Sequence, residues 1–470
     1  MLIKNGTVVT AQGQRRADVL VRDGRIVEVA PGLHAHTDSR SLEGGAGEII
    51  DASGLLVLPG GVDPHTHMDI LVGGLRATDD FYTGTIAAAC GGTTTIIDHM
   101  GFGPPEAAGS LIERVETYHG LADGRAVIDY GFHGVIDHVT EDTLAELSAL
   151  PGLGVTSLKF YMTYDGRLSD EDILRLLVRT RELGILPCVH CENHAILSGL
   201  QERFVAEGKR TAHYHPLSRP DYCEAEAVGR VLALAHAAGD APLYIVHTST
   251  AASLKVAAAA GAAGPLASSP SWFLETCPQY LTLDEALYDA ADDEGLKYLM
   301  SPPLRRAQDR DALWQALADG RVSTVGTDHC PWNFADEKQR GRTDFTKCPN
   351  GAPGVELRLA LLHSEGVVRR ALPLERMVEV CSTLPARIFG LYPRKGTIAP
   401  GSDADLVLFD PERTLTVTHS LLHENVDYTP YEGMELVGWP VATISRGEII
   451  MRDGEFYGAP GRGRYLHRTL

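Results

Sequence analysis

The sequence predicts an α/β fold, a (β/α)8 TIM-like barrel with a small β-sandwich domain built from both chain termini. In the middle of the 470-residue chain, eight short apolar runs alternate with helical patterns, which is the element count of such a barrel. The runs recur at close to the roughly 31 residues per strand–helix unit expected for a barrel of about 250 residues. The two ends of the chain carry only short strands and turns, so we expect them to join into one domain.

The terminal segments are expected to hold the β-sandwich. The predicted strands are 2–10, 18–22, 25–29 and 48–51 at the start, and 406–409, 414–417, 441–445 and 448–451 at the end. Turns are predicted at Arg446-Gly447 and Asp453-Gly454. We therefore predict a sandwich domain made of residues 1–58 and 387–470, bracketing a barrel of residues 59–386. The basic tail, residues 462–468, is expected to be an arm that lies on a neighbouring subunit.

The barrel strands are predicted from apolar, β-favouring runs. They are 56–62, 93–98, 127–132, 156–160, 186–189, 243–246, 273–276 and 323–325. Helices are predicted over 170–183, with Ser169 as N-cap, and over 223–238. No strand pattern lies between His190 and His247, which are 57 residues apart in the sequence. We therefore expect one strand–helix unit plus a helical insertion there.

Potential metal ligands stand at the end of five of these strands. His65 and His67 are two residues apart, so both imidazoles leave the same face of an extended strand. The other candidates are Lys159, His190, His247 and Asp328. They fall on strands one, four, five, six and eight, and the C-terminal ends of barrel strands meet at one rim. The sequence therefore predicts a metal site at this rim.

The chemistry of this set indicates two divalent ions. Six residues are more ligands than one four-coordinate ion takes, and two ions can share a hydroxide that attacks a substrate. An ammonium cannot bind a cation, so Lys159 would react with CO2 to form N6-carboxylysine, which bridges both ions. The alternative is a lysine paired with a rim carboxylate. Asp328 would take the hydroxide proton and pass it to a leaving nitrogen; the alternative is a helix-capping aspartate.

Composition argues against several other classes. The formal net charge is −20, and no basic cluster could hold nucleic acid or an anionic membrane. The first residues do not resemble a signal peptide, and no run of 18 apolar residues occurs. Eight scattered cysteines, several inside apolar strands, suggest reduced thiols and a cytoplasmic protein. Cys188 and Cys191 would leave opposite faces of a strand, too far apart for a disulfide.

Several motifs together resemble the dihydropyrimidinase/hydantoinase family of the amidohydrolase superfamily. They are PGGVDPHTH (59–67), GGTTT (91–95), VHCEN (189–193), VHTS (246–249), SPPLR (301–305), GTDHCP (326–331) and GSDADL (401–406). The resemblance covers essentially the whole chain. It implies a cyclic amide hydrolase with a carboxylated lysine at Lys159, a binuclear zinc site (with Mn2+ or Co2+ as alternatives) and a homotetramer.

The resemblance also implies substrate contacts. Tyr164 matches the family tyrosine that hydrogen-bonds the carbonyl oxygen as it becomes an oxyanion, and Ser301 and Asn350 match positions whose backbone groups hold the ring amide. Val72, Tyr161 and Leu168 match positions that line the pocket for the ring substituent. The alternatives are loop packing for Tyr164, turn formation for Ser301 and Asn350, and core packing for the apolar three. Residues 98–104 and 159–164 look most like phenylhydantoinase-type members, which indicates tolerance of aryl substituents.

Other functions remain as alternatives. Dihydroorotase and allantoinase share the metal scheme, but dihydroorotase carries an Arg two residues past the second His, where this chain has Asp69. A neutral cyclic ureide is therefore the expected substrate: a 5-substituted hydantoin or a dihydropyrimidine, opened to an N-carbamoyl amino acid. A non-catalytic scaffold is the third possibility. His99 and His133 end strands two and three without a place in the metal scheme and are interpreted as structural.

Overall fold

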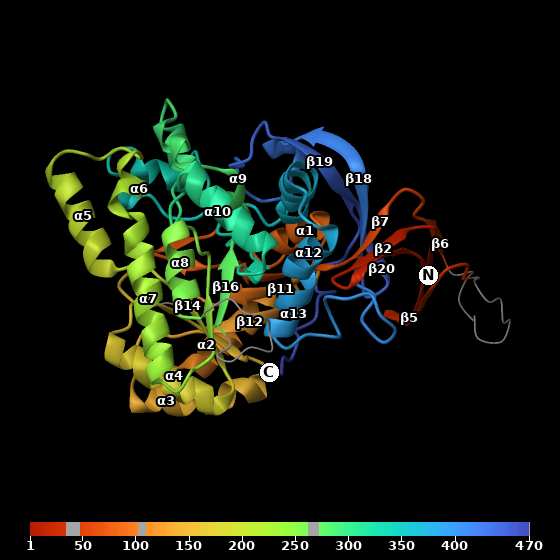
Figure 1. Ribbon diagram of the computed structural model, residues 1–470, viewed down its shortest axis with the longest axis horizontal. Coiled ribbons are helices and arrows are strands. Elements are labelled where there is room, and N and C mark those ends of the chain that lie inside the picture. Colours follow the sequence, from red (N-terminus) through yellow and green to blue (C-terminus); the bar gives the residue numbers. More distant parts are fainter. Residues whose placement is uncertain (34–47, 102–109, 262–271, 470) are drawn as a thin grey trace.

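Eight parallel strands form a barrel at the centre of the molecule (Figure 1). The computed structural model describes residues 1–33, 48–101, 110–261 and 272–469. In chain order the barrel strands are β8 (Gly61–Thr66), β11 (Thr93–His99), β12 (Asp129–Val135), β13 (Ser157–Tyr161), β14 (Leu186–His190), β15 (Leu243–Ile245), β16 (Trp272–Thr276) and β17 (Thr324–Val325). Each strand pairs with the next one along the chain. The predicted fold class and strand order are confirmed.

The barrel closes between its last strand and its first. A parallel bridge joins Thr66 to His329, just beyond β17. The amide of Asp328 donates to the carbonyl of His65 (2.9 Å), and the amide of His67 donates to that of His329 (2.9 Å). The closing hydrogen bonds therefore run through residues of the predicted metal site.

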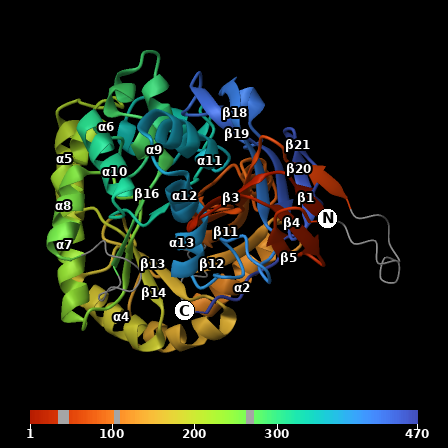
Figure 2. The same ribbon diagram turned by 45° about the vertical axis from the view of Figure 1, so that its right-hand side comes forward.

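Helices cover the outside of the barrel (Figures 1 and 2). They are α1 (Thr83–Cys90), α2 (Leu111–Ala122), α3 (Glu141–Glu146), α4 (Asp170–Leu183), α5 (His194–Ala206), α6 (Tyr214–Ser218), α7 (Asp221–Ala237), α8 (Ala251–Ala259), α9 (Pro278–Thr282), α10 (Ala307–Ala318), α11 (Arg358–Leu361), α12 (Leu374–Val378) and α13 (Leu384–Ile388). The helix predicted over 170–183 is α4, and Ser169 caps it by accepting from the amide of Asp172. The predicted insertion between β14 and β15 consists of α5, α6 and α7.

Both ends of the chain contribute to two packed sheets beside the barrel (Figure 2). One sheet has the order β5-β4-β1-β6 and the other β21-β20-β19-β18-β7-β2-β3. Their strands are β1 (Leu2–Lys4), β2 (Thr7–Thr10), β3 (Gly13–Arg16), β4 (Asp18–Arg22), β5 (Arg25–Ala30), β6 (Ile49–Asp51), β7 (Leu56–Pro59), β18 (Leu406–Thr416), β19 (Glu435–Ser445), β20 (Glu448–Arg452) and β21 (Glu455–Phe456). Side chains such as Ile3, Val57 and Ile444 form a separate apolar cluster in this part of the molecule.

The strand predicted over 56–62 is wrong as one element. It divides at Gly60, and β7 joins the terminal sheet while β8 starts the barrel. A Cβ on Gly60 would lie 2.1 Å from Oγ1 of Thr94, so only glycine permits this close passage of β11. The strand predicted over 2–10 likewise divides into β1 and β2, which belong to different sheets, whereas the two predicted over 406–409 and 414–417 are one strand, β18.

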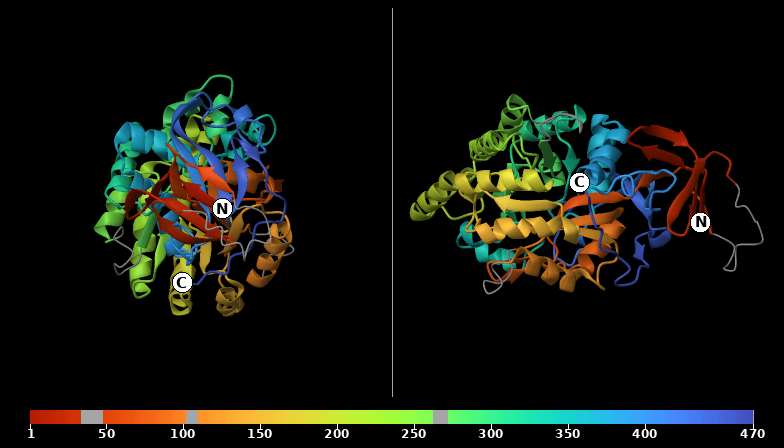
Figure 3. Two further views of the ribbon diagram at one scale, coloured as in Figure 1. Left: turned by 90° about the vertical axis from the view of Figure 1, so that its right-hand side faces the viewer. Right: turned by 90° about the horizontal axis from the view of Figure 1, so that it is seen from below.

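The prediction that the basic tail lies on a neighbouring subunit is wrong for residues 462–468. Leu466 is fully buried among barrel side chains that include Val62 and Phe389. Its amide donates to the carbonyl of Tyr130, and Arg468 donates to Oγ of Ser157 (2.9 Å). Figure 3 shows this end of the chain against the barrel, away from the N-terminus. The tail is therefore part of the packing of its own chain.

The eight cysteines all lie in the described part of the chain, buried and without disulfides, as expected. Among the described residues no helix combines the length and the apolar character needed to cross a membrane.

Candidate metal centre

Five of the six predicted ligands lie at or just beyond the C-terminal ends of their barrel strands, and Lys159 lies in the middle of its strand. His65 is inside β8 and His67 just beyond it, Lys159 is the third residue of β13, and His190 is the last residue of β14. His247 and Asp328 follow β15 and β17. The five histidine and lysine residues are buried, and the Asp328 side chain is 14% exposed. The fold therefore brings the whole predicted set to one mouth of the barrel.

The imidazoles form two groups. Oδ1 of Asp328 lies 3.0 Å from Nε2 of His65 and 3.0 Å from Nε2 of His67. Nδ1 of His190 lies 2.9 Å from Nε2 of His247. The His65 and His247 ring centroids are 5.5 Å apart, so the groups adjoin.

Three observations fit this donor set to metal ions. Nε2 of His65 is buried without a hydrogen-bonding partner among the described residues, although it faces Asp328 at short range. Nδ1 of His190 and Nε2 of His247 face each other at 2.9 Å, so both nitrogens are directed at the same small region. Imidazole nitrogens and a carboxylate are also the ligand types that zinc and related divalent ions take.

Two buried glutamates orient the imidazoles, and sequence reasoning did not find either. Oε1 of Glu275, in β16, lies 2.6 Å from Nδ1 of His65, and Oε2 of Glu192 lies 2.8 Å from Nε2 of His190. Each carboxylate leaves the opposite ring nitrogen directed at the candidate centre, as carboxylate partners of metal-binding histidines do. A signal was present for Glu275, because a charged residue stands inside the apolar run of β16.

Charge interactions organise the first group. Burial lowers the pKa of His65, but Glu275 and Asp328 outweigh it and raise the pKa to about 9. Burial lowers the pKa of His67 to about 4. Burial would raise the pKa of Asp328, but His65 and His67 hold it well below its usual range. In the metal-free protein a proton on His65 therefore occupies the region between these groups, where a cation would bind.

Three of the predicted residues have left-handed backbone conformations. The φ angles are 69° for Tyr164, 38° for His247 and 54° for Asp328. Such angles are uncommon in residues other than glycine, and each stores about 1–3 kcal/mol that the surrounding packing must offset. Their concentration at one rim is typical of a functional site.

Tyr164 and Tyr161 lie beside the second group. Their ring centroids are 5.2 and 5.8 Å from that of His190, and 6.0 Å from each other. Burial raises the pKa of Tyr164 to about 12, and the nearby Arg219 cation is the largest opposing influence. Tyr164 is therefore a neutral phenol near the candidate metal ligands.

The other predicted substrate-binding residues differ in their burial and contacts. Ser301 is buried, and the carbonyl of Asn350 accepts from Nε1 of Trp332 (3.0 Å). Leu168 belongs to the main hydrophobic core, whereas Val72 is exposed on the short hairpin of β9 (Leu71–Val72) and β10 (Leu75–Arg76). Residues 102–104 of the phenylhydantoinase-like stretch lie outside the described residues.

The two remaining strand-end histidines differ from each other. His133 is fully engaged, because Nε2 contacts the carbonyl of Pro64 (2.9 Å) and Nδ1 contacts Ser157 (2.6 Å). His99 is buried, and within the described part of the chain neither of its ring nitrogens has a hydrogen-bonding partner. Its ring centroid lies 4.4 Å from that of His65 and 4.2 Å from that of His133.

A parallel barrel whose strand ends present imidazoles, an aspartate and a lysine at one mouth defines a class: barrel hydrolases that work with metal ions. The family follows from comparison with known proteins. The chain belongs to the amidohydrolase family, which it matches over residues 56–450.

Similar proteins cover the whole chain. D-phenylhydantoinase from Escherichia coli O1:K1 is 48% identical over 468 residues, which is 100% of this chain and 98% of the relative. The structure of D-hydantoinase from Bacillus sp. AR9 superposes with a TM-score of 0.93 at 44% identity, covering 100% of this chain and 99% of the other. The structure of dihydropyrimidinase from Brevibacillus agri NCHU1002 superposes with a TM-score of 0.93 at 44% identity, covering 100% of this chain and 98% of the other.

Proposed function

We propose that this protein hydrolyses the cyclic amide bond of 5-substituted hydantoins and dihydropyrimidines, releasing N-carbamoyl amino acids. The observation that carries this proposal is the convergence of His65, His67 and Asp328 at 3.0 Å contacts, next to a second imidazole group that has the neutral phenol of Tyr164 beside it. The similar proteins described above are named for the same reaction class. Because two of them are named as D-specific, we further propose a preference for the D enantiomer.

His65, His67 and Asp328 would hold one divalent ion, and His190 and His247 a second, with carboxylated Lys159 shared between them. Zn2+ is the proposed ion, with Mn2+ or Co2+ as alternatives. When bound, such ions polarise a carbonyl and lower the pKa of water to about 7. Burial lowers the pKa of Lys159, which favours the neutral amine, the form that reacts with CO2.

The side chains would divide the reaction between them. Asp328 accepts the proton of the attacking water and delivers it to the ring nitrogen as the carbon–nitrogen bond breaks. Tyr164 donates a hydrogen bond to the carbonyl oxygen as negative charge develops there. Backbone groups of Ser301 and Asn350 hold the ring amide, and Val72, Tyr161 and Leu168 contact the substituent.

A dihydroorotase-like activity fits the site less well. The position that would carry the carboxylate-binding Arg is Asp69, a buried residue that accepts from the amide of Phe81 (3.2 Å) and pairs with Arg76 (3.3 Å). A second negative charge from substrate would meet this carboxylate, and no arginine stands at the position to clamp it. An allantoinase-like activity would be distinguished from the proposed one by testing allantoin as a substrate.

A substrate panel tests the proposal. Ring opening would be followed for hydantoin, both enantiomers of 5-phenylhydantoin, dihydrouracil, dihydroorotate and allantoin. The expected result is turnover of D-5-phenylhydantoin with the least activity on dihydroorotate. Turnover of dihydroorotate or allantoin alone would assign the site to those reactions. Absence of all turnover together with no bound metal would favour a non-catalytic scaffold.

Assembly and location complete the proposal. We propose a homotetramer, by resemblance to the family, and a cytoplasmic location, which eight free buried cysteines support. Light scattering of the purified protein would measure the assembly directly.

A further inference from the structure

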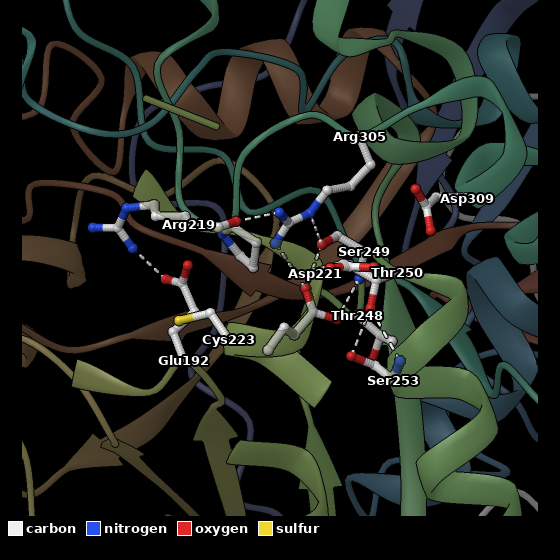
Figure 4. Close-up of polar contacts among 12 residues, drawn as sticks. Glu192, Arg219, Asp221, Cys223, Thr248, Ser249, Thr250, Ser253, Arg305 and Asp309 are labelled. Atoms are coloured by element: carbon white, nitrogen blue, oxygen red, sulfur yellow. Dashed lines mark hydrogen bonds and ion pairs between the residues drawn. The ribbon is translucent and has the colours of Figure 1, made fainter. Parts of the chain in front are cut away.

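A buried arginine, Arg219, lies between a partner of the predicted metal ligand His190 and the predicted substrate-binding residue Tyr164. It stands in the connection between α6 and α7, within the insertion after β14, and is only 2% exposed. Figure 4 shows its side chain directed at Glu192. A guanidinium buried to this degree needs a carboxylate partner and further acceptors.

The first contact of Arg219 leads to a predicted metal ligand. Nη1 donates to Oε2 of Glu192, the same oxygen that lies 2.8 Å from Nε2 of His190. Burial would raise the pKa of Glu192, but Arg219 and then His190 lower it to about 2. Glu192 is therefore a carboxylate fixed between a permanent cation and the imidazole, and it holds His190 with Nδ1 facing His247.

The second contact leads to the predicted substrate-binding tyrosine. The guanidinium carbon lies 5.7 Å from the centroid of the Tyr164 ring. Burial would lower the pKa of Arg219, but the Glu192 carboxylate first, and then the nearby Tyr164, raise it. The cation in turn is the largest influence that counters the effect of burial on the pKa of Tyr164.

The backbone around Arg219 is itself held in place. Nη1 of Arg305 donates to the carbonyl of Arg219, and Nε of Arg305 donates to Oγ of Ser249 (3.0 Å), as Figure 4 shows. Glu224 balances the charge of Arg305 and accepts from the amide of Ser249 (3.0 Å). Arg219 is thus anchored from behind to the segment that follows His247.

We propose that Arg219 is a positioning residue for the reaction: it fixes His190 through Glu192 and holds the ring of Tyr164, over which its guanidinium lies. A metal ligand and a carbonyl-binding group then keep one relative placement, as electrostatic stabilisation of an oxyanion requires. A cation beside the phenol also makes its hydroxyl a stronger hydrogen-bond donor. This inference rests on the proposed function, because the role of Tyr164 belongs to it.

A double-mutant cycle tests the contact with Tyr164. The variants are Arg219→Gln, Tyr164→Phe and the combination, with kcat measured on 5-phenylhydantoin at saturating metal. Arg219→Gln alone should lower kcat by about 10-fold or more, but by less than about 3-fold when Tyr164 is already Phe, since contacting residues are non-additive. Equal losses in both backgrounds, or a wild-type kcat in Arg219→Gln, would overturn the proposal.

Metal affinity tests the contact through Glu192 without reference to activity. Chelator competition on the Tyr164→Phe and double variants should show metal binding weakened by about 10-fold when Arg219 is removed, the lower range for loss of an outer partner of a metal ligand. Unchanged affinity would overturn this half of the proposal. Arg230→Gln, on the outer face of α7 and paired with Glu226 and Asp170, is the matched control and should leave both measurements unchanged.

Arg219→Lys guards against a folding defect. Lysine keeps the charge but cannot bridge two partners with a planar fork, so we expect kcat between those of wild type and Arg219→Gln. A full wild-type kcat in Arg219→Lys would overturn the bridging role. The proposed function has separate tests: Tyr164→Phe without effect removes the tyrosine from the reaction, and no ring opening by wild type removes the reaction itself.

Discussion

Nδ1 of His65 lies 2.6 Å from Oε1 of Glu275, and this contact decides which nitrogen of the ring faces Asp328. The same carboxylate group accepts from the amide of His247 (3.0 Å) and the hydroxyl of Tyr244 (2.8 Å). Glu275 is fully buried. It therefore orients residues of both imidazole groups from a single position on β16.

Glu275→Gln should weaken metal binding by about 10–100-fold, because the variant keeps the shape but loses the charge that orients His65. Chelator competition with metal analysis measures the change. Glu285→Gln, whose partner is the exposed Arg306, is the control. Equal metal affinity for Glu275→Gln and wild type would contradict the orienting role.

Metal binding to the stripped protein should strengthen as pH rises. The pKa of His65 is raised to about 9, so below that pH a proton must leave Nε2 before an ion can bind. Apparent affinity should increase by about tenfold per pH unit from neutral pH and level off near pH 9. In Glu275→Gln, which lacks the chief cause of the raised pKa, the levelling should come at lower pH. A flat profile in wild type would contradict the assignment of His65 as a ligand.

Lys159→Ala should lose metal and activity, with partial recovery in a short carboxylic acid such as acetate, which can replace the missing carboxylate. Metal content and ring opening are measured with and without the acid. Lys347→Ala, at an exposed position, is the control. Wild-type metal content and turnover in Lys159→Ala would exclude a bridging lysine.

Tyr164→Phe should lower kcat by about 10²–10³-fold with metal retained, the usual cost of losing one oxyanion donor. Steady-state kinetics with parallel metal analysis decides the point. If kcat is unchanged, Tyr164 has no part in the reaction.

Gly60→Ala should destabilise the fold by about 1–3 kcal/mol, as overpacking does, because the new Cβ would lie 2.1 Å from Oγ1 of Thr94. Urea unfolding measures the difference. Thr94→Ala should restore part of the loss in the double variant. Gly152→Ala, where a Cβ would meet nothing within 4 Å, should lower the free energy of unfolding by less than Gly60→Ala or the double variant does. An equal loss of stability for the two glycine variants would contradict the steric explanation.

The barrel and the candidate ligands could be predicted because one local pattern recurs. Five of the apolar runs lead to a potential metal ligand, as at Cys188-Val189-His190, and the topology of a parallel barrel brings such positions together. The tight turn at Arg446-Gly447 could also be predicted from the local sequence. The two residues have positive φ angles of 46° and 75°, as a tight hairpin requires.

What could not be predicted depends on contacts across the fold. Arg219 has no strand-end pattern and acquires its role only when α6 and α7 place it over Glu192. The division at Gly60 was missed because apolar residues continue on both sides of it, and only the approach of Thr94 reveals the need for glycine. The prediction for the basic tail is wrong because its sequence does not show which surface it contacts, whereas in the structure Arg468 is buried against the barrel of its own chain.

The position of β7 has a consequence for how the protein is made. β7 is an interior strand of its sheet, with β2 on one side and β18, about 350 residues later in the sequence, on the other. During translation at about 5–20 residues per second, the β18 side of β7 stays unpaired for roughly 20–70 s. Unpaired strand edges recruit other chains. In heterologous expression, slower growth and added chaperones should therefore raise the yield of this protein, because they protect the incomplete chain before β18 has been synthesised.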